Sequence, residues 1–313
     1  MLISESDKLK IGFVGLGRMG GGIAQNIVKA GYETMVYDVD SSKYAPFYDK
    51  CRIGGSVGET FDFSDVLLIS LPGSPQVEAV VEPLLECNME GRTIIDLSTS
   101  YPMSSIRLYQ AIKQNNGVFM DASLTGSPEN AIQGTLNVLV GGEEEQFRKY
   151  SNLLASFSKN RFYTGSAGTG NLMKLASNYL SIMYIALYAE ILPFVEQLGV
   201  NPAVVFDVIS ASGANSPIFQ LVAPKIIKER YDISFLMDLG FKDLSYLKRL
   251  MDEKGLPSFL MDSGINLYKM AKCKGLGQND ISEVAKVIRD IIKDKSRQMQ
   301  KDIQRIKNEE GGI

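Results

Sequence analysis

One stretch near the N-terminus decides the fold: Leu9-Lys10-Ile11-Gly12-Phe13-Val14, followed at once by Gly15-Leu16-Gly17-Arg18-Met19-Gly20. The first run is apolar and strand-like, and the residues after Gly20 predict a helix that stops at Gly31. This is the G-x-G-x-x-G pattern in the strand-to-helix setting that it requires. Its glycines permit a tight turn, the approach of a pyrophosphate to the backbone, and close helix packing. We therefore expect a dinucleotide to bind at Gly15, Leu16, Gly17, Arg18 and Met19.

The residue after the second strand-like run indicates which dinucleotide binds. The run Glu33–Tyr37 ends in Asp38, at about the spacing where an acidic residue accepts the adenosine ribose hydroxyls. A carboxylate there would repel a ribose phosphate, and no arginine follows Asp38 before Arg52. The sequence thus predicts NAD in preference to NADP. The alternative is an ordinary turn aspartate, since the residues from Asp38 to Ser42 are also good helix-capping sequence.

Composition and charge exclude several classes of protein. A chain of 313 residues with 45% hydrophobic content is long enough for one large or two modest cores. The net charge of −3 gives no sign of a nucleic-acid partner. Cys51, Cys87 and Cys273 match no metal-ligand spacing and are odd in number, as expected for unpaired thiols in a reducing compartment such as the cytoplasm. No metal site is expected.

Two segments could in principle act as a membrane span or an export signal. The first eight residues are short and charged, so we expect no signal peptide. The apolar segment from Tyr179 to Val195 is too short for a membrane span, contains Glu190 and is interrupted by Pro193. A buried helix, and no membrane partner, is the expectation.

The order of the remaining segments predicts two domains. Strand-like runs alternate with helical patterns as far as about residue 164, and everything from Gly168 onward is helical. The predicted fold class is α/β, with an N-terminal Rossmann doubly wound sheet followed by an all-helical C-terminal domain. We place the dinucleotide domain at 1–165, the helical domain at 166–290 and an amphipathic helix at 291–313. The further strand-like runs are 66–70, 93–97, 117–122, 136–142 and 161–164.

Two loops that follow predicted strands, and one lysine on a predicted helix, are further candidate site residues. Ligands bind beyond the carboxyl ends of parallel strands, so Pro72 and Thr99, which follow two such strands, would border the nicotinamide end, with plain turn chemistry as the alternative. The stretch Gly168-Thr169-Gly170-Asn171-Leu172-Met173-Lys174-Leu175-Ala176-Ser177-Asn178 reads as a glycine turn entering an apolar helix.

Lys174 and Asn178 share one face of that helix because they are four residues apart. Leu172, Met173, Leu175 and Tyr179 are expected to surround the lysine with apolar side chains, which would favour its neutral amine. The chain contains no histidine, so proton transfer near neutral pH needs another group, and a desolvated lysine is a known substitute. The alternative is a lysine that extends from a core helix into solvent.

Four segments of the chain, in order, resemble the signatures of the β-hydroxyacid dehydrogenases, the family that includes 3-hydroxyisobutyrate dehydrogenase and tartronate semialdehyde reductase. They are Gly12–Gly20, Asp121–Ser127, Gly168–Lys174 and Phe241–Leu244. The resemblance covers about residues 10 to 290 and implies hydride transfer between NAD and a short hydroxy acid or the matching semialdehyde, in a homodimer or homotetramer.

The resemblance also implies roles for individual residues. Lys174 would be the catalytic acid/base, Lys242 would close over the nicotinamide, and Asn178 would help to hold the substrate. Cofactor contacts are implied for Leu71, Pro72 and Thr99, and substrate contacts for Ser123, Thr125, Gly126 and Ser127.

The second signature departs from the family pattern D-A-P-V-S-G-G at four places: Ser123, Leu124, Thr125 and Ser127. Ser127 adds bulk and a donor where the family commonly has none, which favours a smaller or more polar acid than hydroxyisobutyrate. Tartronate and succinic semialdehyde reductases, and a non-catalytic scaffold of the same fold, are the alternatives. Lys174 argues against the scaffold and against imine reductases, while chain length and the lack of histidine argue against 6-phosphogluconate dehydrogenase.

The C-terminal pattern leaves two interpretations open. From Ile288, apolar residues recur at near-heptad spacing as Ile292, Met299 and Ile306. The helix would either pack on its own domain or extend across a dimer partner.

Overall fold

The computed structural model describes residues 9–295. The chain divides between Ala176 and Ser177 into two compact units. The division falls inside one helix, α8 (Thr169–Gln197), which is therefore shared by both units.

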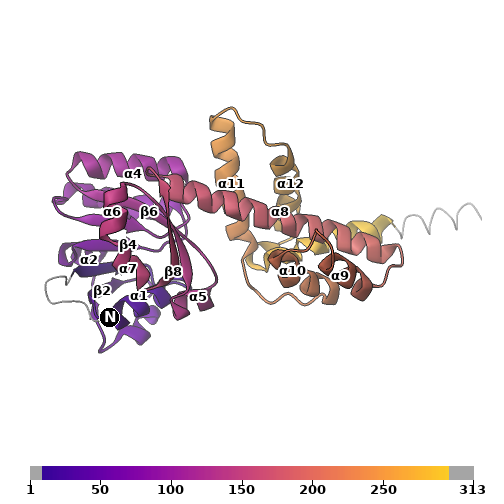
Figure 1. Cartoon of the computed structure of the whole chain (residues 1–313), viewed down its shortest axis with the longest axis horizontal. Coiled ribbons are helices and arrows are strands. Elements are labelled where there is room, and N and C mark those ends of the chain that lie inside the picture. The colour runs from indigo at the N-terminus through magenta and orange to yellow at the C-terminus, as the bar shows by residue number, and fades with distance from the viewer. Residues whose placement is uncertain (1–8, 296–313) are drawn as a thin grey trace, which may run out of the picture. The chain divides into compact units, whose positions relative to one another are not determined.

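The first unit is built on one sheet of eight strands, in the spatial order β3-β2-β1-β4-β5-β6-β7-β8 (Figure 1). Neighbouring strands are parallel except for the antiparallel pair β6 and β7. The strand order reverses direction between β1 and β4, which is the switch point where doubly wound sheets bind ligands. The strands are β1 (Lys10–Val14), β2 (Glu33–Tyr37), β3 (Arg52–Ile53), β4 (Val66–Ile69), β5 (Thr93–Asp96), β6 (Val118–Thr125), β7 (Leu136–Gly141) and β8 (Ser158–Gly165).

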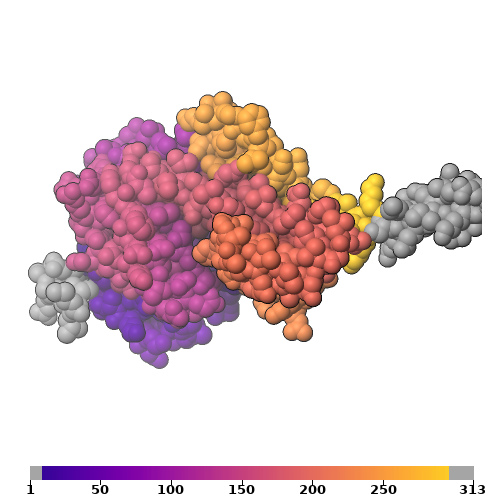
Figure 2. All heavy atoms as spheres, turned by 45° about the vertical axis from the view of Figure 1, so that its right-hand side comes forward, coloured from indigo at the N-terminus to yellow at the C-terminus, as the bar shows by residue number. Residues whose placement is uncertain are grey.

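Helices connect these strands and cover the sheet. Both faces carry a buried apolar cluster, one around Phe13 and Ile23 and the other around Val77 and Phe119. Figure 2 shows the surface of this unit in indigo to magenta. The helices are α1 (Gly20–Lys29), η2 (Ser41–Phe47), α2 (Val57–Phe63), α3 (Ser74–Val81), η3 (Glu82–Glu86), α4 (Pro102–Gln114), α5 (Pro128–Gln133), α6 (Glu144–Lys149) and α7 (Ser151–Ala155).

The second unit is helical in the part that the structure describes. Its core joins α8 to the later helices, and the buried Tyr268 hydroxyl donates to the carbonyl of Ile182 at 2.9 Å. Residues 285–295 are also helical. The named elements are α9 (Pro202–Ser210), α10 (Pro217–Lys228), α11 (Met237–Glu253), α12 (Phe259–Cys273), η4 (Leu276–Gln278) and η5 (Ile281–Val284).

The predicted fold class is confirmed, with differences in detail. β6 continues to Thr125 rather than ending at Ala122, because its last residues pair with β7. The expectation that Pro193 interrupts the apolar segment is wrong, since α8 runs through it. The predicted domain limits, 1–165, 166–290 and 291–313, stay predictions, and residues 296–313 of the expected terminal helix lie outside the described part of the chain.

By length and composition, α8 is one helix within residues 9–295 that is able to cross a bilayer. This is weak evidence for a span, because core helices pass the same test. Ile182, Ala189 and Leu192 on α8 are buried against the protein itself. The helix thus has the apolar packing face of a core helix.

Candidate active site

The glycine turn after β1 is tied to the end of β2 by two backbone donors. The N–H of Gly15 donates to the carbonyl of Tyr37 at 2.9 Å, and the N–H of Leu16 donates to Oδ2 of Asp38 at 2.6 Å. Gly17 and Arg18 are exposed, whereas the Leu16 side chain is buried in the core. No described side chain caps the N-terminus of α1. These features leave the helix N-terminus open to an anion such as a pyrophosphate.

Asp38 is both a turn residue and a partner of the glycine turn. Its Oδ1 accepts from the N–H of Asp40 at 2.8 Å while its Oδ2 holds Leu16. The side chain is half-buried. The next arginine, Arg52, pairs with Glu33 at 3.1 Å and lies over the ring of Phe63. The structure therefore places a carboxylate beside the glycine turn, and its contact with a ribose stays a prediction.

The loops that follow β4 and β5 are fastened to each other and to α8. The N–H of Leu71 donates to Oγ of Ser98 at 2.9 Å, and the N–H of Ser100 donates to Oδ1 of Asn171 at 2.7 Å. Thr99, between these two serines, is half-buried, and Pro72 is exposed. The two loops thus lie at the carboxyl edge of the sheet, where the sequence expected them.

Asn171 is a buried residue at the start of α8. Besides Ser100, its Oδ1 accepts from Oγ of Ser123 at 2.6 Å, and its Nδ2 donates to Oγ of Ser105 at 3.0 Å. One side chain therefore joins the β5 loop, β6, α4 and α8. The sequence did not predict this role, although a polar residue inside an otherwise apolar helical run is a signal for it.

Lys174 lies on α8, three residues after Asn171, and is half-buried. The expected apolar surroundings form only in part. Leu175 is buried, but Leu172 and Met173 are 38% and 48% exposed, so the prediction that they enclose the lysine is wrong. They face outward because the buried side of this first turn is taken by Asn171 and Leu175.

The segment proposed to cradle a carboxylate is the end of a strand and the start of a helix. Ser123 is fully buried inside β6, and Nδ2 of Asn137 donates to Oγ1 of Thr125 at 3.0 Å. Ser127 is the N-cap of α5, and its N–H and hydroxyl both bond to Oδ1 of Asn130, at 2.9 and 3.1 Å. Gly126 is exposed, with a φ of 131°. Their contacts with a substrate stay predictions.

Within the second unit, one buried carboxylate joins two of the predicted site residues. Nδ2 of Asn178 donates to Oδ2 of Asp243 at 2.6 Å, and Nζ of Lys242 lies 3.3 Å from Oδ1 of the same carboxylate. Asp243 is 3% exposed. Asp243 therefore fixes the amide of Asn178 and the ammonium of Lys242 relative to each other, a role that the sequence did not reveal.

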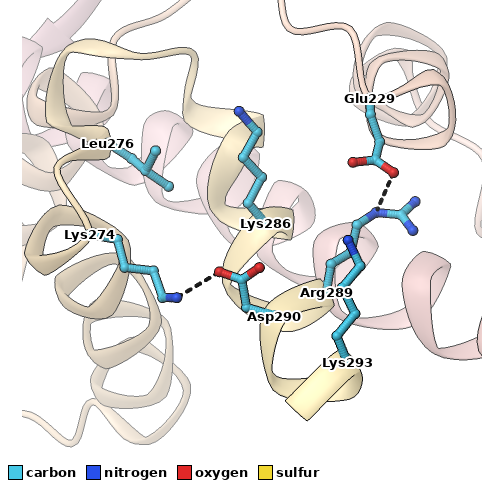
Figure 3. Close-up of a pocket in the computed structure, with 7 residues that line it drawn as sticks. All are labelled: Glu229, Lys274, Leu276, Lys286, Arg289, Asp290 and Lys293. Carbon is cyan, nitrogen blue, oxygen red and sulfur yellow. Dashed lines mark hydrogen bonds and ion pairs between the residues drawn. The ribbon is translucent and has the colours of Figure 1, made fainter. Parts of the chain in front are cut away.

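Two pockets found within the described residues do not contain the predicted site residues. One pocket, of about 480 Å³, lies beside the helix at 285–295. In Figure 3 the amino group of Lys274 points at the carboxylate of Asp290, and Glu229 faces Arg289. These pairs are 2.7 and 3.8 Å long, so much of the pocket's charge is neutralised. The candidate active site thus rests on the motifs and their contacts. Residues 9–295 hold no cluster of metal-ligating side chains.

Two sequence families match the chain in tandem. Residues 10–165 match the family described as the NAD binding domain of 6-phosphogluconate dehydrogenase. Residues 168–288 match the NAD-binding family of NADP-dependent 3-hydroxyisobutyrate dehydrogenase. The two matches divide the chain close to the beginning of α8.

Whole proteins match over nearly the full length. The chloroplastic glyoxylate/succinic semialdehyde reductase 2 of Arabidopsis thaliana is 29% identical, over 91% of this chain and 81% of its own. The 2-hydroxy-3-oxopropionate reductase of Escherichia coli is also 29% identical, over 86% of this chain and 90% of its own. Among solved structures, a 3-hydroxyisobutyrate dehydrogenase of Mycobacterium tuberculosis shares the fold, with a TM-score of 0.83, 23% identity, and coverage of 90% and 99% of the two chains. The chain belongs to the β-hydroxyacid dehydrogenase family, whose members are NAD(P)-dependent dehydrogenases and reductases.

Proposed function

We propose that this protein transfers hydride between NAD and the hydroxyl-bearing carbon of a short β-hydroxy acid, or reduces the matching semialdehyde. One observation carries the proposal. At a single edge of the first unit's sheet, the glycine turn is bonded to Asp38, and the β5 loop that holds Thr99 is bonded to Asn171, three residues before Lys174. A dinucleotide fits this edge, because α1 has no side-chain cap and a Cβ on Gly17 would meet nothing within 4 Å.

The chemical roles follow from the groups present. The nicotinamide supplies the hydride acceptor or donor. In oxidation the neutral amine of Lys174 accepts the hydroxyl proton of the substrate; in reduction its ammonium donates that proton to the forming alkoxide. General acid–base catalysis of this kind contributes on the order of a hundredfold to ten-thousandfold. Leu71, Pro72 and Lys242 would border the nicotinamide.

The substrate's carboxylate would meet the end of β6. The N–H and hydroxyl of Ser127 are already bonded to Asn130, so the N–H of Gly126 and the hydroxyl hydrogen of Thr125 are the donors we expect to face it. Ser123 would act indirectly, because its hydroxyl donates to Asn171 and not to the substrate. Relatives named for glyoxylate, succinic semialdehyde and 2-hydroxy-3-oxopropionate support a small acid. A tartronate or succinic semialdehyde is thus the second candidate for the same chemistry.

Cofactor choice is testable by steady-state kinetics. With 3-hydroxyisobutyrate and with the tartronate, succinic and methylmalonate semialdehydes as test substrates, we expect kcat/KM to be at least about tenfold higher with NAD(H) than with NADP(H), because the Asp38 carboxylate repels a ribose phosphate. The Asp38→Asn variant removes that charge, so its preference should shrink.

Arg52→Ala serves as the matched control, since this exposed arginine is paired with Glu33. Equal or better efficiency with NADP in the wild-type enzyme would mean that Asp38 is only a turn residue. One of the two matching families is described by an NADP-dependent enzyme, so measuring kcat/KM with both dinucleotides is the direct test of the predicted NAD preference.

A homodimer or homotetramer is supported by an apolar face on the second unit. Leu180, Tyr184, Leu187, Ile191, Phe194 and Leu198 are 42–69% exposed and recur every three or four residues along and just beyond α8. Contiguous apolar surface of this kind is typical of a protein interface. The predicted terminal arm at 291–313 stays a separate possibility for the same association.

We expect Leu187→Glu to reduce the mass in solution to that of a monomer, measured by light scattering after gel filtration. Leu256→Glu is the matched control, because Leu256 is 56% exposed and Leu187 57%, but Leu256 lies off α8. A charge in the middle of the apolar face should oppose its burial. If both variants keep the wild-type mass, the face does not mediate association.

We propose that the protein works in a reducing compartment such as the cytoplasm, without a membrane or nucleic-acid partner. All three cysteines are free thiols, and burial raises the pKa of the Cys51 thiol to about 11. The net charge of −3 also opposes association with nucleic acid.

A further inference from the structure

Asp121 is a fully buried carboxylate on β6 that none of the roles above uses. Its Oδ1 accepts from the N–H of Gly168 at 2.6 Å, and its Oδ2 accepts from the N–H of Asn171 at 2.8 Å. These two donors lie where the chain enters α8 and in its first turn. A carboxylate at a helix N-terminus satisfies donors that the helix leaves unpaired and is stabilised by the helix dipole.

The first turn of α8 packs so closely on the sheet that it leaves no room for a side chain at Gly170. A Cβ on Gly170 would come within 2.4 Å of the carbonyl oxygen of Leu139 and within 2.9 Å of Oδ2 of Asp121. A residue larger than glycine would therefore lift the first turn away from the sheet. The backbone of α8 packs directly on β6 and β7 at Gly170.

The contact of this first turn with β6 and β7 determines the positions of two predicted site residues. Lys174 follows Asn171 by three residues, less than one helical turn, so the backbone that carries it is fixed by the first turn of α8. The side chain of Asn171 holds the N–H of Ser100, next to Thr99. A displacement of the first turn would move the lysine and the β5 loop together.

We propose that Asp121 is a positioning residue for the reaction: its carboxylate holds the first turn of α8 in the place from which Lys174 and Thr99 act. The proposal rests on the function proposed above, in which Lys174 transfers the proton. A shift of about 1 Å in a catalytic group can cost on the order of a hundredfold in rate. Small displacements of the first turn of α8 should therefore lower kcat measurably.

The surroundings of Asp121 make its contact with the first turn of α8 depend on pH. Asp96 on β5 lies in register beside it and is also fully buried, whereas β7 presents Gly141 and α8 presents backbone N–H groups. Burial raises the pKa of Asp121 to about 7, the charge of Asp96 adds to the rise, and the bonds from Gly168 and Asn171 oppose it. Below that pH the carboxyl gains a proton and becomes a weaker acceptor for two N–H groups.

The test is the pH profile of kcat in the direction of reduction, with succinic semialdehyde and tartronate semialdehyde as probes. In this direction Lys174 must carry a proton, so its own titration lowers activity only as pH rises. We expect the wild-type enzyme to lose activity as the pH falls below about 7. Asp121→Asn should lower kcat by about tenfold to a hundredfold at pH 8, with little change in the KM for the dinucleotide. It should also abolish the loss of activity below pH 7, which is the acid limb of the profile.

Asp280→Asn is the matched control. Asp280 is another fully buried carboxylate that accepts backbone N–H groups, from Ser234 and Ser282, but it lies outside the site. The control should keep the acid limb whatever it does to stability. An Asp121→Asn enzyme with wild-type kcat, or with the acid limb intact, would overturn the proposal.

A second measurement needs neither a variant nor turnover. The bonds from Gly168 and Asn171 lower the pKa of Asp121, so breaking them while the carboxyl stays buried in the sheet would raise that pKa, and protonation therefore favours release of the first turn. Amide hydrogen exchange of residues 168–174 in the wild-type protein, corrected for the intrinsic pH dependence of exchange, should show less protection at pH 6 than at pH 8. Equal protection at both pH values would contradict a role for the Asp121 carboxylate. If no hydroxy acid or semialdehyde is turned over, the proposed function fails, yet this exchange experiment still decides whether Asp121 holds the helix.

Discussion

Lys174→Ala is expected to lower turnover by at least about a hundredfold, the low end of what general acid–base catalysis contributes. The fold and the binding of NAD should be retained, because Lys174 is half-buried on the surface of α8 and belongs to neither apolar cluster of the first unit. Turnover of the best test substrate and calorimetric titration with NAD would measure the two effects separately.

Two further substitutions sharpen that result. Lys174→Arg should rescue little, since a guanidinium keeps the charge but is effectively never a neutral base. Asn178→Ala should act chiefly on substrate KM, because its amide is held by Asp243 and does not exchange protons. A Lys174→Ala enzyme that binds NAD and turns over a hydroxy acid at near wild-type rate would remove the lysine from the chemistry.

The second large effect concerns two glycines of one turn. A Cβ on Gly20 would lie 1.9 Å from the carbonyl oxygen of Gly15, whereas a Cβ on Gly17 would meet nothing within 4 Å. Gly20→Ala should therefore destabilise the first unit by about 3 kcal/mol, which lowers its melting temperature by roughly 6–12 °C. Gly17→Ala should leave stability within about 0.5 kcal/mol.

The same pair separates packing from ligand binding. The added methyl of Gly17→Ala occupies the space through which a pyrophosphate approaches the backbone, so we expect NAD affinity to fall by at least about tenfold. Calorimetry gives both the melting temperature and the dissociation constant. If Gly17→Ala binds NAD as tightly as the wild-type protein does, the glycine turn is not the pyrophosphate site.

Local sequence was enough to predict the central strands and the glycine turn. β1, β2, β4 and β5 are short apolar runs followed by turn residues, the pattern that is typical of buried parallel strands. The end of β6 was harder, because Ser123 and Thr125 read as loop residues. Pairing with β7 keeps them in the strand, and no local pattern shows that these two strands pair.

The site could be predicted by residue type and motif but not by contact. Lys174, Asn178 and Lys242 were chosen because motifs and helical spacing single them out. The carboxylates and the amide that fix their surroundings, Asp121, Asp243 and Asn171, gain their importance only when distant segments meet. Their pairing spans 50 residues between Asp121 and Asn171 and 65 between Asn178 and Asp243.

We propose that Lys174 transfers the proton that is coupled to hydride transfer. The most direct measurement is a single-turnover experiment with enzyme and NAD in excess over the hydroxy acid, following nicotinamide absorbance in the wild-type protein and in Lys174→Ala. We expect the hydride-transfer step itself to slow by at least about a hundredfold in the variant, while the NAD dissociation constant stays unchanged. A hydride-transfer rate within a few-fold of the wild-type rate would contradict it.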